Sequence, residues 1–319
     1  MTSAYQRLAD LVAAHGAAAL VRVAAVQGSA PREAGAAMAV RPDGAFHGTI
    51  GGGELEWRAL AEARTALAEK RGPMRRLDMQ LGPDLGQCCG GRAIVTVETF
   101  DARDLDALRT IAEAAAEGWA LAARMGEDGR VVRAGAEDAI PEGGWIEETG
   151  PRPTPLLLFG AGHVGRALVL ALAPLPFRAR WIDTRADAFP AHVPATATAV
   201  HTDEPGLEIA QAPPGAFALV MTHSHPLDRA LTAAALARED FPFVGLIGSA
   251  TKRARFERRF REIGVPEARI AALACPIGLP GIAGKEPAII ATATAAQLLQ
   301  ARERALSGDL STPSAGPAP

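Results

Sequence analysis

The chain has 319 residues, which is enough for two domains of ordinary size that each bury a hydrophobic core. With 33 Lys and Arg against 36 Asp and Glu, its net charge of -3 gives no general attraction to nucleic acid or to an anionic membrane. No apolar run approaches the length of a signal sequence or a membrane span. Because its three cysteines are an odd number, we expect a cytoplasmic protein with free thiols.

Residues 1–140 are predicted to form an N-terminal α/β domain. The segment Pro42-Asp43-Gly44 is a hairpin signal, and the second strand of this hairpin ends in Gly51, Gly52 and Gly53 before a helix. The turn-rich segment 27–35, with Ser29 and Arg32, is a candidate functional loop. Apolar periodicity predicts helices over 3–14, 54–70 and 104–117, strands over 20–26, 37–41, 45–50, 77–80 and 93–100, and a hairpin around 126–129.

Two of the three cysteines, Cys88 and Cys89, are adjacent in a glycine-rich loop between two predicted strands. A disulfide between neighbouring cysteines strains the peptide that joins them, so structure alone gains little from the pair. Glycine N–H groups can instead stabilise a thiolate, which is the form that binds soft metals or attacks sulfur. The loop, which continues into Gly90 and Gly91, is therefore a candidate soft-ligand or redox site. The alternative is two small buried side chains at a turn.

The second half of the chain is predicted to be a Rossmann-like domain over residues 156–305. Residues 141–155, rich in Pro, Gly and Glu, are predicted to link the two domains, and residues 306–319 are predicted to be a disordered tail. Alternating strands and helices are typical of a doubly wound parallel sheet. The predicted strands cover 156–159, 179–183, 216–222 and 243–247, and helices are expected up to residue 172 and over 227–237, 251–263 and 287–304.

A dinucleotide-binding fingerprint opens this second domain. Gly160, Gly162 and Gly165 follow the first strand and begin a helix, and Asp183 ends the second strand at the spacing of a ribose-binding carboxylate. Arg185 could accommodate an added phosphate or face solvent, so the choice between NAD and NADP stays open. The glycines also serve helix-to-strand packing when no nucleotide binds.

Three further features of the second domain involve polar or thiol side chains. Ser249 and Lys252 begin a helix after a strand, which indicates an anion site or, alternatively, a helix N-cap with a solvated base. His223 and His225 lack a third ligand at motif spacing, so we expect them to line the crevice or cap a helix rather than bind a metal. Cys275 is predicted to be a core thiol.

Motifs in both halves of the chain together point to a known family. The first half has Gly28-Ser29-Ala30-Pro31-Arg32, Gly48-Thr49-Ile50-Gly51-Gly52-Gly53 and Gln87-Cys88-Cys89-Gly90-Gly91, and the second has the Rossmann unit, Thr222-His223-Ser224-His225, Gly245-Leu246-Ile247-Gly248-Ser249 and Pro276-Ile277-Gly278-Leu279. In this order they resemble the XdhC/CoxI family, accessory factors of xanthine dehydrogenase and related molybdenum hydroxylases. The resemblance runs over most of residues 21–299 and is strongest to the xanthine dehydrogenase branch.

The resemblance implies a chaperone rather than an enzyme. Such a protein binds molybdenum cofactor (molybdopterin), shields it while a cysteine desulfurase supports its sulfuration, and delivers it to the molybdenum subunit of xanthine dehydrogenase. It also implies a homodimer. Many CoxI-like relatives have a cysteine where this chain has Glu54, so that thiol is absent here. Cys89 fits the family's recurrent cysteine better than Cys88.

Under this resemblance, Cys89 is the expected contact to molybdenum or its exchangeable sulfur. Gly51 to Gly53 and Ser29 to Arg32 are the expected contacts to the pterin or its phosphate. The Rossmann crevice could hold cofactor phosphate, a nucleotide such as NAD(P), or nothing. Two other functions compete: an NAD(P)-dependent oxidoreductase, and a protein-binding module that positions a desulfurase. The oxidoreductase is disfavoured because no acid or base has a visible orienting partner.

Overall fold

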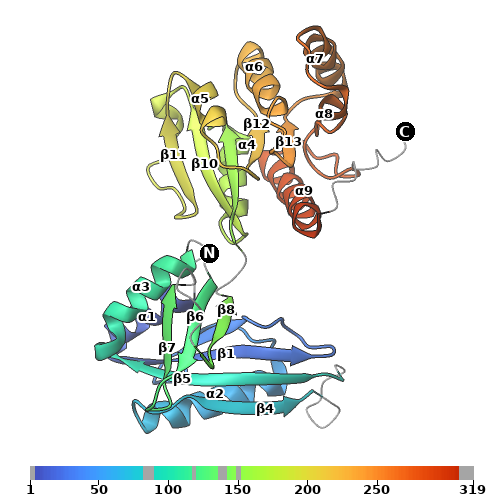
Figure 1. Cartoon of the computed structure of the whole chain (residues 1–319). Coiled ribbons are helices and arrows are strands. Elements are labelled where there is room, and N and C mark those ends of the chain that lie inside the picture. Colours follow the sequence, from blue (N-terminus) through green and yellow to red (C-terminus); the bar gives the residue numbers. More distant parts are fainter. Residues whose placement is uncertain (1–3, 82–89, 117–119, 136–141, 149–151, 309–319) are drawn as a thin grey trace. The chain divides into compact units, whose positions relative to one another are not determined.

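The computed structural model describes residues 4–81, 90–116, 120–135, 142–148 and 152–308. The chain divides between Arg152 and Pro153 into two compact units, which we describe separately (Figure 1). None of the helices in the described part of the chain is both long and apolar enough to cross a membrane.

The first unit contains a five-stranded antiparallel sheet in the order β3-β2-β1-β5-β4. β1 and β5 pair along nearly their whole length, and the predicted hairpin forms as β2 and β3. The strands are β1 (Ala17–Gln27), β2 (Ala37–Val40), β3 (Phe46–Gly48), β4 (Arg75–Gln80) and β5 (Arg92–Asp101).

Alternation along β1 divides the core of this unit between the two faces of the sheet. Val21 and Val23 point to the face covered by α2 (Gly53–Ala68), whereas Leu20 points to the face covered by α1 (Ala4–His15) and α3 (Leu105–Ala116). This follows from the two-residue period of a strand, which sends successive side chains to opposite faces. The three helices agree with the predicted ones to within one or two residues at nearly every end.

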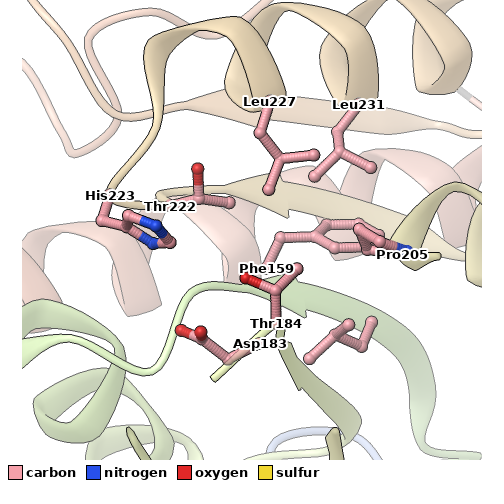
Figure 2. A pocket seen from close by; sticks show the side chains of 9 residues that line it. Phe159, Asp183, Thr184, Pro205, Thr222, His223, Leu227 and Leu231 are labelled. Atoms are coloured by element: carbon pink, nitrogen blue, oxygen red, sulfur yellow. The ribbon is translucent and has the colours of Figure 1, made fainter. Parts of the chain in front are cut away.

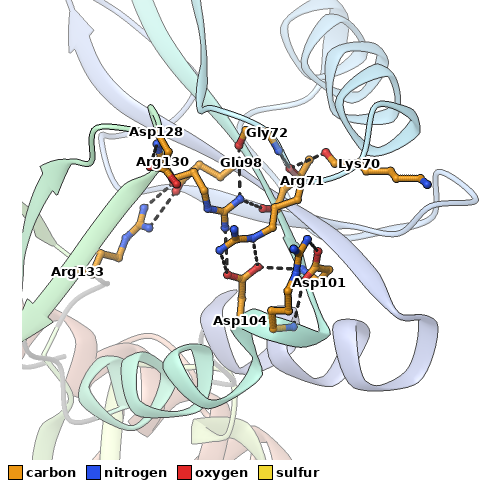
Figure 3. A network of polar contacts seen from close by, with 11 residues as sticks. Lys70, Arg71, Gly72, Glu98, Asp101, Asp104, Asp128, Arg130 and Arg133 are labelled. Atoms are coloured by element: carbon orange, nitrogen blue, oxygen red, sulfur yellow. Dashed lines mark hydrogen bonds and ion pairs between the residues drawn. The ribbon is translucent and has the colours of Figure 1, made fainter.

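A second, three-stranded sheet completes the first unit, in the order β7-β6-β8. β6 (Ala120–Met125) and β7 (Val131–Gly135) form the predicted hairpin, and β8 (Trp145–Glu148) pairs with β6. The prediction of a linker over 141–155 was wrong for β8, because Ala122 and Ala123 of β6 pair with Ile146 and Trp145. Arg133 of β7 ties this sheet to the first through Glu98 of β5 (Figure 3).

The second unit is a doubly wound parallel sheet in the order β11-β10-β9-β12-β13, so the predicted Rossmann-like fold is confirmed. The strand order reverses between β9 and β12, which is where such sheets bind ligands. The strands are β9 (Thr154–Phe159), β10 (Phe177–Asp183), β11 (Ala197–His201), β12 (Phe217–Val220) and β13 (Phe243–Leu246).

Helices cover both faces of this parallel sheet. Leu156 and Leu158 of β9 pack with α4 (His163–Leu172) and α9 (Pro287–Ser307). Leu157 and Phe159 pack on the opposite face, which is covered by α5 (Pro205–Ala210), α6 (His225–Leu236), α7 (Ala250–Glu262) and α8 (Glu267–Ala271). The near-continuous apolar run of β9 is therefore buried on both sides, as expected for a central parallel strand.

Three short elements of the second unit were absent from the sequence prediction: β11, α5 and α8. β11 is the edge strand, and its residues are at most half-buried, so its sequence lacks an apolar run. α5 and α8 have six and five residues, too short for a clear helical period. At the other end, α9 continues to Ser307, two residues into the predicted tail, and Gly308 closes it in a left-handed conformation with φ 71°. The rest of that tail, from residue 309, lies outside the described residues.

Candidate functional site

Three glycine-containing segments of the first unit meet at one place. A Cβ added to Gly51 would lie 2.5 Å from Cβ of Pro31, and a Cβ added to Gly91 would lie 2.3 Å from the carbonyl oxygen of Ser29. Only glycine therefore fits at both positions. The structure thus brings the loop around Ser29 and Arg32, the turn Gly51 to Gly53, and the end of the cysteine loop together.

The glycine turn is built to hold a negatively charged oxygen. Gly51, Gly52 and Gly53 all have positive φ, at 124°, 73° and 64°, which favours glycine over residues with a side chain. The N–H groups of Ile50 and Gly52 donate to Oε2 of Glu56 at 3.0 and 3.3 Å, and Thr49 Oγ1 donates to the same oxygen at 2.5 Å. An internal carboxylate therefore takes the donors that the sequence assigned to a ligand.

Glu56 is a functional candidate that the sequence analysis missed. A Glu in the first turns of a helix that follows a glycine turn is the signal that could have identified it. Glu54, which stands where CoxI-like relatives have cysteine, contacts the neighbouring turn of α2 instead, where its Oε1 accepts from Arg58 Nε at 2.9 Å.

Arg32 places a cation beside the glycine turn. Its Cγ lies 3.6 Å from the Cβ position of Gly51, so its side chain begins beside the glycine turn. Its guanidinium donates to Glu33 at 3.0 Å and is 38% exposed, and the hydrogen bond to Glu33 raises the pKa of Arg32. Among the described residues, the partner of Arg32 is its exposed neighbour Glu33, and a surface ion pair of this kind can exchange its partner for another anion at little cost.

Cys88 and Cys89 lie in residues 82–89, outside the described residues. The chain on either side of them is described: the Leu81 N–H donates to the Gly91 carbonyl at 2.7 Å, and Gly90 is exposed with open space around its Cβ position. The role of the thiols stays a prediction. Gly91, which follows the cysteine loop, lies beside Ser29.

The three fingerprint glycines of the second unit have different environments. A Cβ on Gly160 would lie 2.3 Å from the Met221 carbonyl oxygen, and one on Gly165 would lie 2.2 Å from the Gly160 carbonyl oxygen. These two glycines allow β9, β12 and α4 to approach closely. Gly162 differs, because nothing lies within 4 Å of its Cβ position. It is the N-cap of α4, and it leaves open space where a phosphate would approach the helix.

Asp183 ends β10 as predicted, but its carboxylate is already engaged. Oδ2 accepts from the Ala161 N–H at 2.7 Å and from Arg185 Nη2 at 2.9 Å, and Oδ1 accepts from the N–H and Nε of Arg185, both at 3.0 Å. Burial raises the pKa of Asp183, but the hydrogen bonds from Arg185 and Ala161 outweigh it and lower the pKa to about 2. Four donors fill the acceptor capacity of one carboxylate, so a ribose would have to displace Arg185.

A small pocket of about 10 Å³ lies at the reversal of strand order (Figure 2). Asp183, Thr222 and His223 lie toward one end of it in this view, and Leu227 and Leu231 of α6 lie toward the other. The complete lining is Phe159, Ile182, Asp183, Thr184, Pro205, Thr222, His223, Leu227 and Leu231. A pocket of this volume holds roughly one water molecule, so a ligand as large as a nucleotide would need the pocket to open.

Lys252 is held in a buried ion pair rather than presented to a ligand. Its Nζ donates to Asp228 Oδ2 at 2.6 Å and to the Ile247 carbonyl at 2.9 Å. Asp228 is fully buried and also accepts from the N–H and hydroxyl of Thr222, so it joins the ends of β12 and β13. Ser249 caps α7 by accepting from the Lys252 N–H. Ser249 is therefore a helix N-cap, but Lys252 is paired with Asp228 rather than solvated. Asp228 is a residue that the sequence analysis missed.

The remaining candidates are two histidines and one cysteine of the second unit. His223 lines the pocket, and His225 is the first residue of α6, which Ser224 caps. Within the described residues, no group of three or more His, Cys, Asp or Glu side chains is arranged to hold a metal ion. Cys275 is a buried core thiol as predicted, and burial raises its pKa to about 11. Such a thiol is not reactive near neutral pH.

Comparisons with known proteins agree with this architecture. Residues 11–78 match the family model of the XdhC and CoxI family, and residues 156–298 match that of the XdhC Rossmann domain. The Escherichia coli (strain K12) protein YqeB, described as uncharacterized, is 28% identical over 304 residues, which cover 93% of this chain and 46% of YqeB. The chain thus spans about half the length of this curated relative.

A crystal structure from Bacillus halodurans, described as a xanthine dehydrogenase, has a TM-score of 0.74 to this chain at 22% identity. The match covers 99% of this chain and 98% of that one. At this identity the likeness shows that the two proteins share a fold.

Proposed function

Because the chain belongs to the XdhC and CoxI family, we propose that it is an accessory protein in xanthine dehydrogenase maturation. In this proposal it binds molybdenum cofactor, protects it, supports its sulfuration and inserts it into xanthine dehydrogenase. The observation that carries the proposal is the meeting of three segments in the first unit: the Ser29–Arg32 loop, the glycine turn and the Gly91 end of the cysteine loop.

The described residues fit the anionic part of such a cargo. Molybdenum cofactor presents a phosphate tail, a flat pterin ring and a soft dithiolene that holds the metal. The N–H groups of Ile50 and Gly52 already bind one carboxylate oxygen, so a phosphate oxygen can take the place of Glu56 there. Arg32 adds a cation beside the same turn. Cys89, with Cys88 beside it, is the proposed soft contact to the metal.

The task proposed for this chain is binding rather than turnover. Lys252 and Asp228 form a closed ion pair, and Asp183 is hydrogen-bonded by its own neighbours, so neither carboxylate is poised as a general base. The proposed partners are the molybdenum subunit of xanthine dehydrogenase, a cysteine desulfurase and a second copy of this chain.

The test is co-expression of xanthine dehydrogenase with the wild type, with Cys89→Ala, with Cys275→Ala or with no accessory protein. Activity and molybdenum content of the purified dehydrogenase are measured. We expect Cys89→Ala to behave like the missing protein, because a soft ligand is lost. Cys275→Ala is the matched control, since it removes a buried thiol of the other unit. Cys88→Ala should have a smaller effect than Cys89→Ala.

Equal activity and metal content in all samples would contradict the chaperone function. Metal without activity in the Cys89→Ala sample would place the defect at sulfuration rather than at insertion. Loss of activity with Cys275→Ala to the same degree as with Cys89→Ala would show that the thiol effect is not specific.

One observation favours a second candidate, an NAD(P)-dependent oxidoreductase: Gly162 leaves open space at the N-terminus of α4, the helix that follows the first strand of the Rossmann-like unit. Isothermal titration with NAD and NADP tests it, using Gly162→Val to obstruct the helix N-terminus and Gly206→Val, also at an open position, as control. Binding that Gly162→Val alone removes would support a nucleotide site. No heat with either nucleotide would count against it.

A further inference from the structure

Trp57 is the most exposed large apolar side chain in the described part of the chain, at 72%. It lies on α2, whose buried residues Leu55, Ala59, Ala63 and Ala66 mark the face against the sheet. At 100° per residue, Trp57 is on the opposite side of the helix, facing solvent. An indole offers one of the largest apolar surfaces of any side chain, so leaving it unpacked forgoes stability that the fold could have used.

The place of Trp57 on the helix is specific. It lies four residues after Gly53, which corresponds to about 6 Å along the helix axis. Side chains on a helix lean toward its N-terminus, so the indole extends over the turn that begins at Gly53. The glycine turn folds back on this part of α2, because Glu56 accepts from Thr49, Ile50 and Gly52. Trp57 is thus the neighbour, one helical turn on, of Gly53 at the end of the glycine turn.

We propose that Trp57 stacks on the flat heteroaromatic ring of the bound ligand, the pterin in the case of molybdenum cofactor. The inference rests on the proposed function, and it assigns a residue to the ring. Among side chains, indole presents the largest planar face for stacking on a heterocycle. The turn and Arg32 take the anionic tail of the ligand, and Trp57 takes its ring.

Other exposed apolar residues lack this setting. Leu170 of α4 and Leu306 of α9 are 66% and 65% exposed, but they are aliphatic and lie near the C-terminal ends of their helices in the second unit. Trp181, by contrast, is 1% exposed and donates to the Gly160 carbonyl, so it belongs to the core, and Trp145 of β8 is half-buried. Among these residues, Trp57 alone is exposed, has a planar side chain and lies in the first turns of the helix that follows the glycine turn.

The experiment measures binding of molybdenum cofactor, released without oxygen from a purified molybdenum enzyme, to the full chain. Retained pterin is quantified after gel filtration, and tryptophan fluorescence is followed during titration. The variants are Trp57→Ala, Trp57→Leu and Trp57→Phe, with Leu170→Ala as the matched loss of an exposed apolar side chain. We expect Trp57→Ala and Trp57→Leu to weaken binding by about tenfold, because one stacking contact is lost. Trp57→Phe should keep most of the affinity, and the wild type should show quenching that Trp57→Ala lacks.

Each outcome has a separate meaning. If the wild type retains cofactor and all Trp57 variants bind it equally, the stacking role is refuted while the proposed function stands. If the wild type retains no cofactor, the proposed function fails and the pterin assignment fails with it. If cofactor binding is unchanged but Trp57→Ala no longer activates co-expressed xanthine dehydrogenase, the residue docks a protein, which also overturns the inference. Because Trp57 is exposed, circular dichroism of the variants should match the wild type.

Discussion

Two carboxylates, Glu56 and Asp183, accept hydrogen bonds from backbone N–H groups at the turns that the sequence assigns to anion binding. Glu56 accepts from Ile50 and Gly52, and Asp183 accepts from Ala161. In both units the backbone N–H groups of the turn bind a negatively charged oxygen. In both, that oxygen belongs to a carboxylate of the same chain. A ligand phosphate at either place must compete with an internal carboxylate, so ligand affinity there depends on the residue that holds the carboxylate as much as on the turn.

At the residue scale we predict that Asp183→Asn destabilises the second unit by about 2 kcal/mol at pH 7. Burial raises the pKa of Asp183, but hydrogen bonds from Arg185 and Ala161 lower it overall, from 3.8 to about 2. A lowered folded-state pKa stabilises the fold at every pH above the unfolded value and loses that stabilisation as the pH falls through the folded value. The gap between wild type and Asp183→Asn should therefore narrow between pH 4 and pH 2.

Urea unfolding of both proteins at pH 7 and at pH 3 measures this gap. Asp187→Asn is the control, because it removes an exposed carboxylate four residues further along the chain. A gap that stays constant over this pH range would mean that the charge of Asp183 does not account for the stability.

At the scale of elements, a buried set of charges joins the two sheets of the first unit (Figure 3). Arg133 of β7 donates to Glu98 of β5 at 3.0 Å and to Glu147 of β8 at 2.6 Å, and its side chain is 1% exposed. Tyr5 of α1 also donates to Glu147, at 2.9 Å. Arg130, in the turn just before β7, donates to the Thr99 carbonyl and to Asp104. The position of the three-stranded sheet is therefore specified by directional polar contacts as well as by apolar packing.

We predict that Arg133→Met costs about 3–5 kcal/mol of unfolding free energy, because it leaves the carboxylates of Glu98 and Glu147 buried with less compensation. Burial raises the pKa of Glu147, but Arg133 lowers it overall, so without Arg133 that pKa should rise. Thermal unfolding followed by circular dichroism measures the change.

Arg103→Met is the matched control for this prediction, since Arg103 is 70% exposed and pairs with Asp101 at the surface. It should leave the unfolding midpoint nearly unchanged. A similar midpoint for both variants would contradict the structural role of Arg133.

At the scale of the whole molecule, each unit has its own hydrophobic core. The core clusters of the first unit contain only residues up to Leu121, and those of the second contain only residues from Leu156 onward, among the described buried residues. Each unit also keeps all strands of its own sheets. Folding of one unit therefore does not depend on core contacts from the other.

We predict that residues 1–152 and 153–319, produced separately, each unfold cooperatively, because neither loses part of a core or sheet. Differential scanning calorimetry of both pieces measures this. A chain divided after Gly215 is the control, since that cut separates β9 from its neighbour β12 and should give no folded product. An unfolded 153–319 piece would show that the second unit needs the first.

The sequence alone determined the fold class, the family and most element positions. Long buried strands such as β1 and β9 have apolar runs, glycines mark the turns, and these signals are local. The same locality explains the failures. β11 is an exposed edge strand without an apolar run, and β8 lies in a Pro- and Gly-rich stretch, so its strand character depends on pairing with β6.

Only the tertiary structure decided which candidate residues share a site and which are already occupied. The sequence places Ser29, Gly51 and Gly91 far apart. They meet because β5 begins at Arg92 opposite the end of β1 at Gln27, and because the loop after β1 also contacts Gly51 through Pro31. Both interpretations of the sequence treated Lys252 as a free cation, whereas in the structure it pairs with Asp228, which is fully buried. Hydrogen-bond partners and burial depend on residues distant in the chain, so composition and spacing identify the residue types of a site while folding determines what each of them contacts.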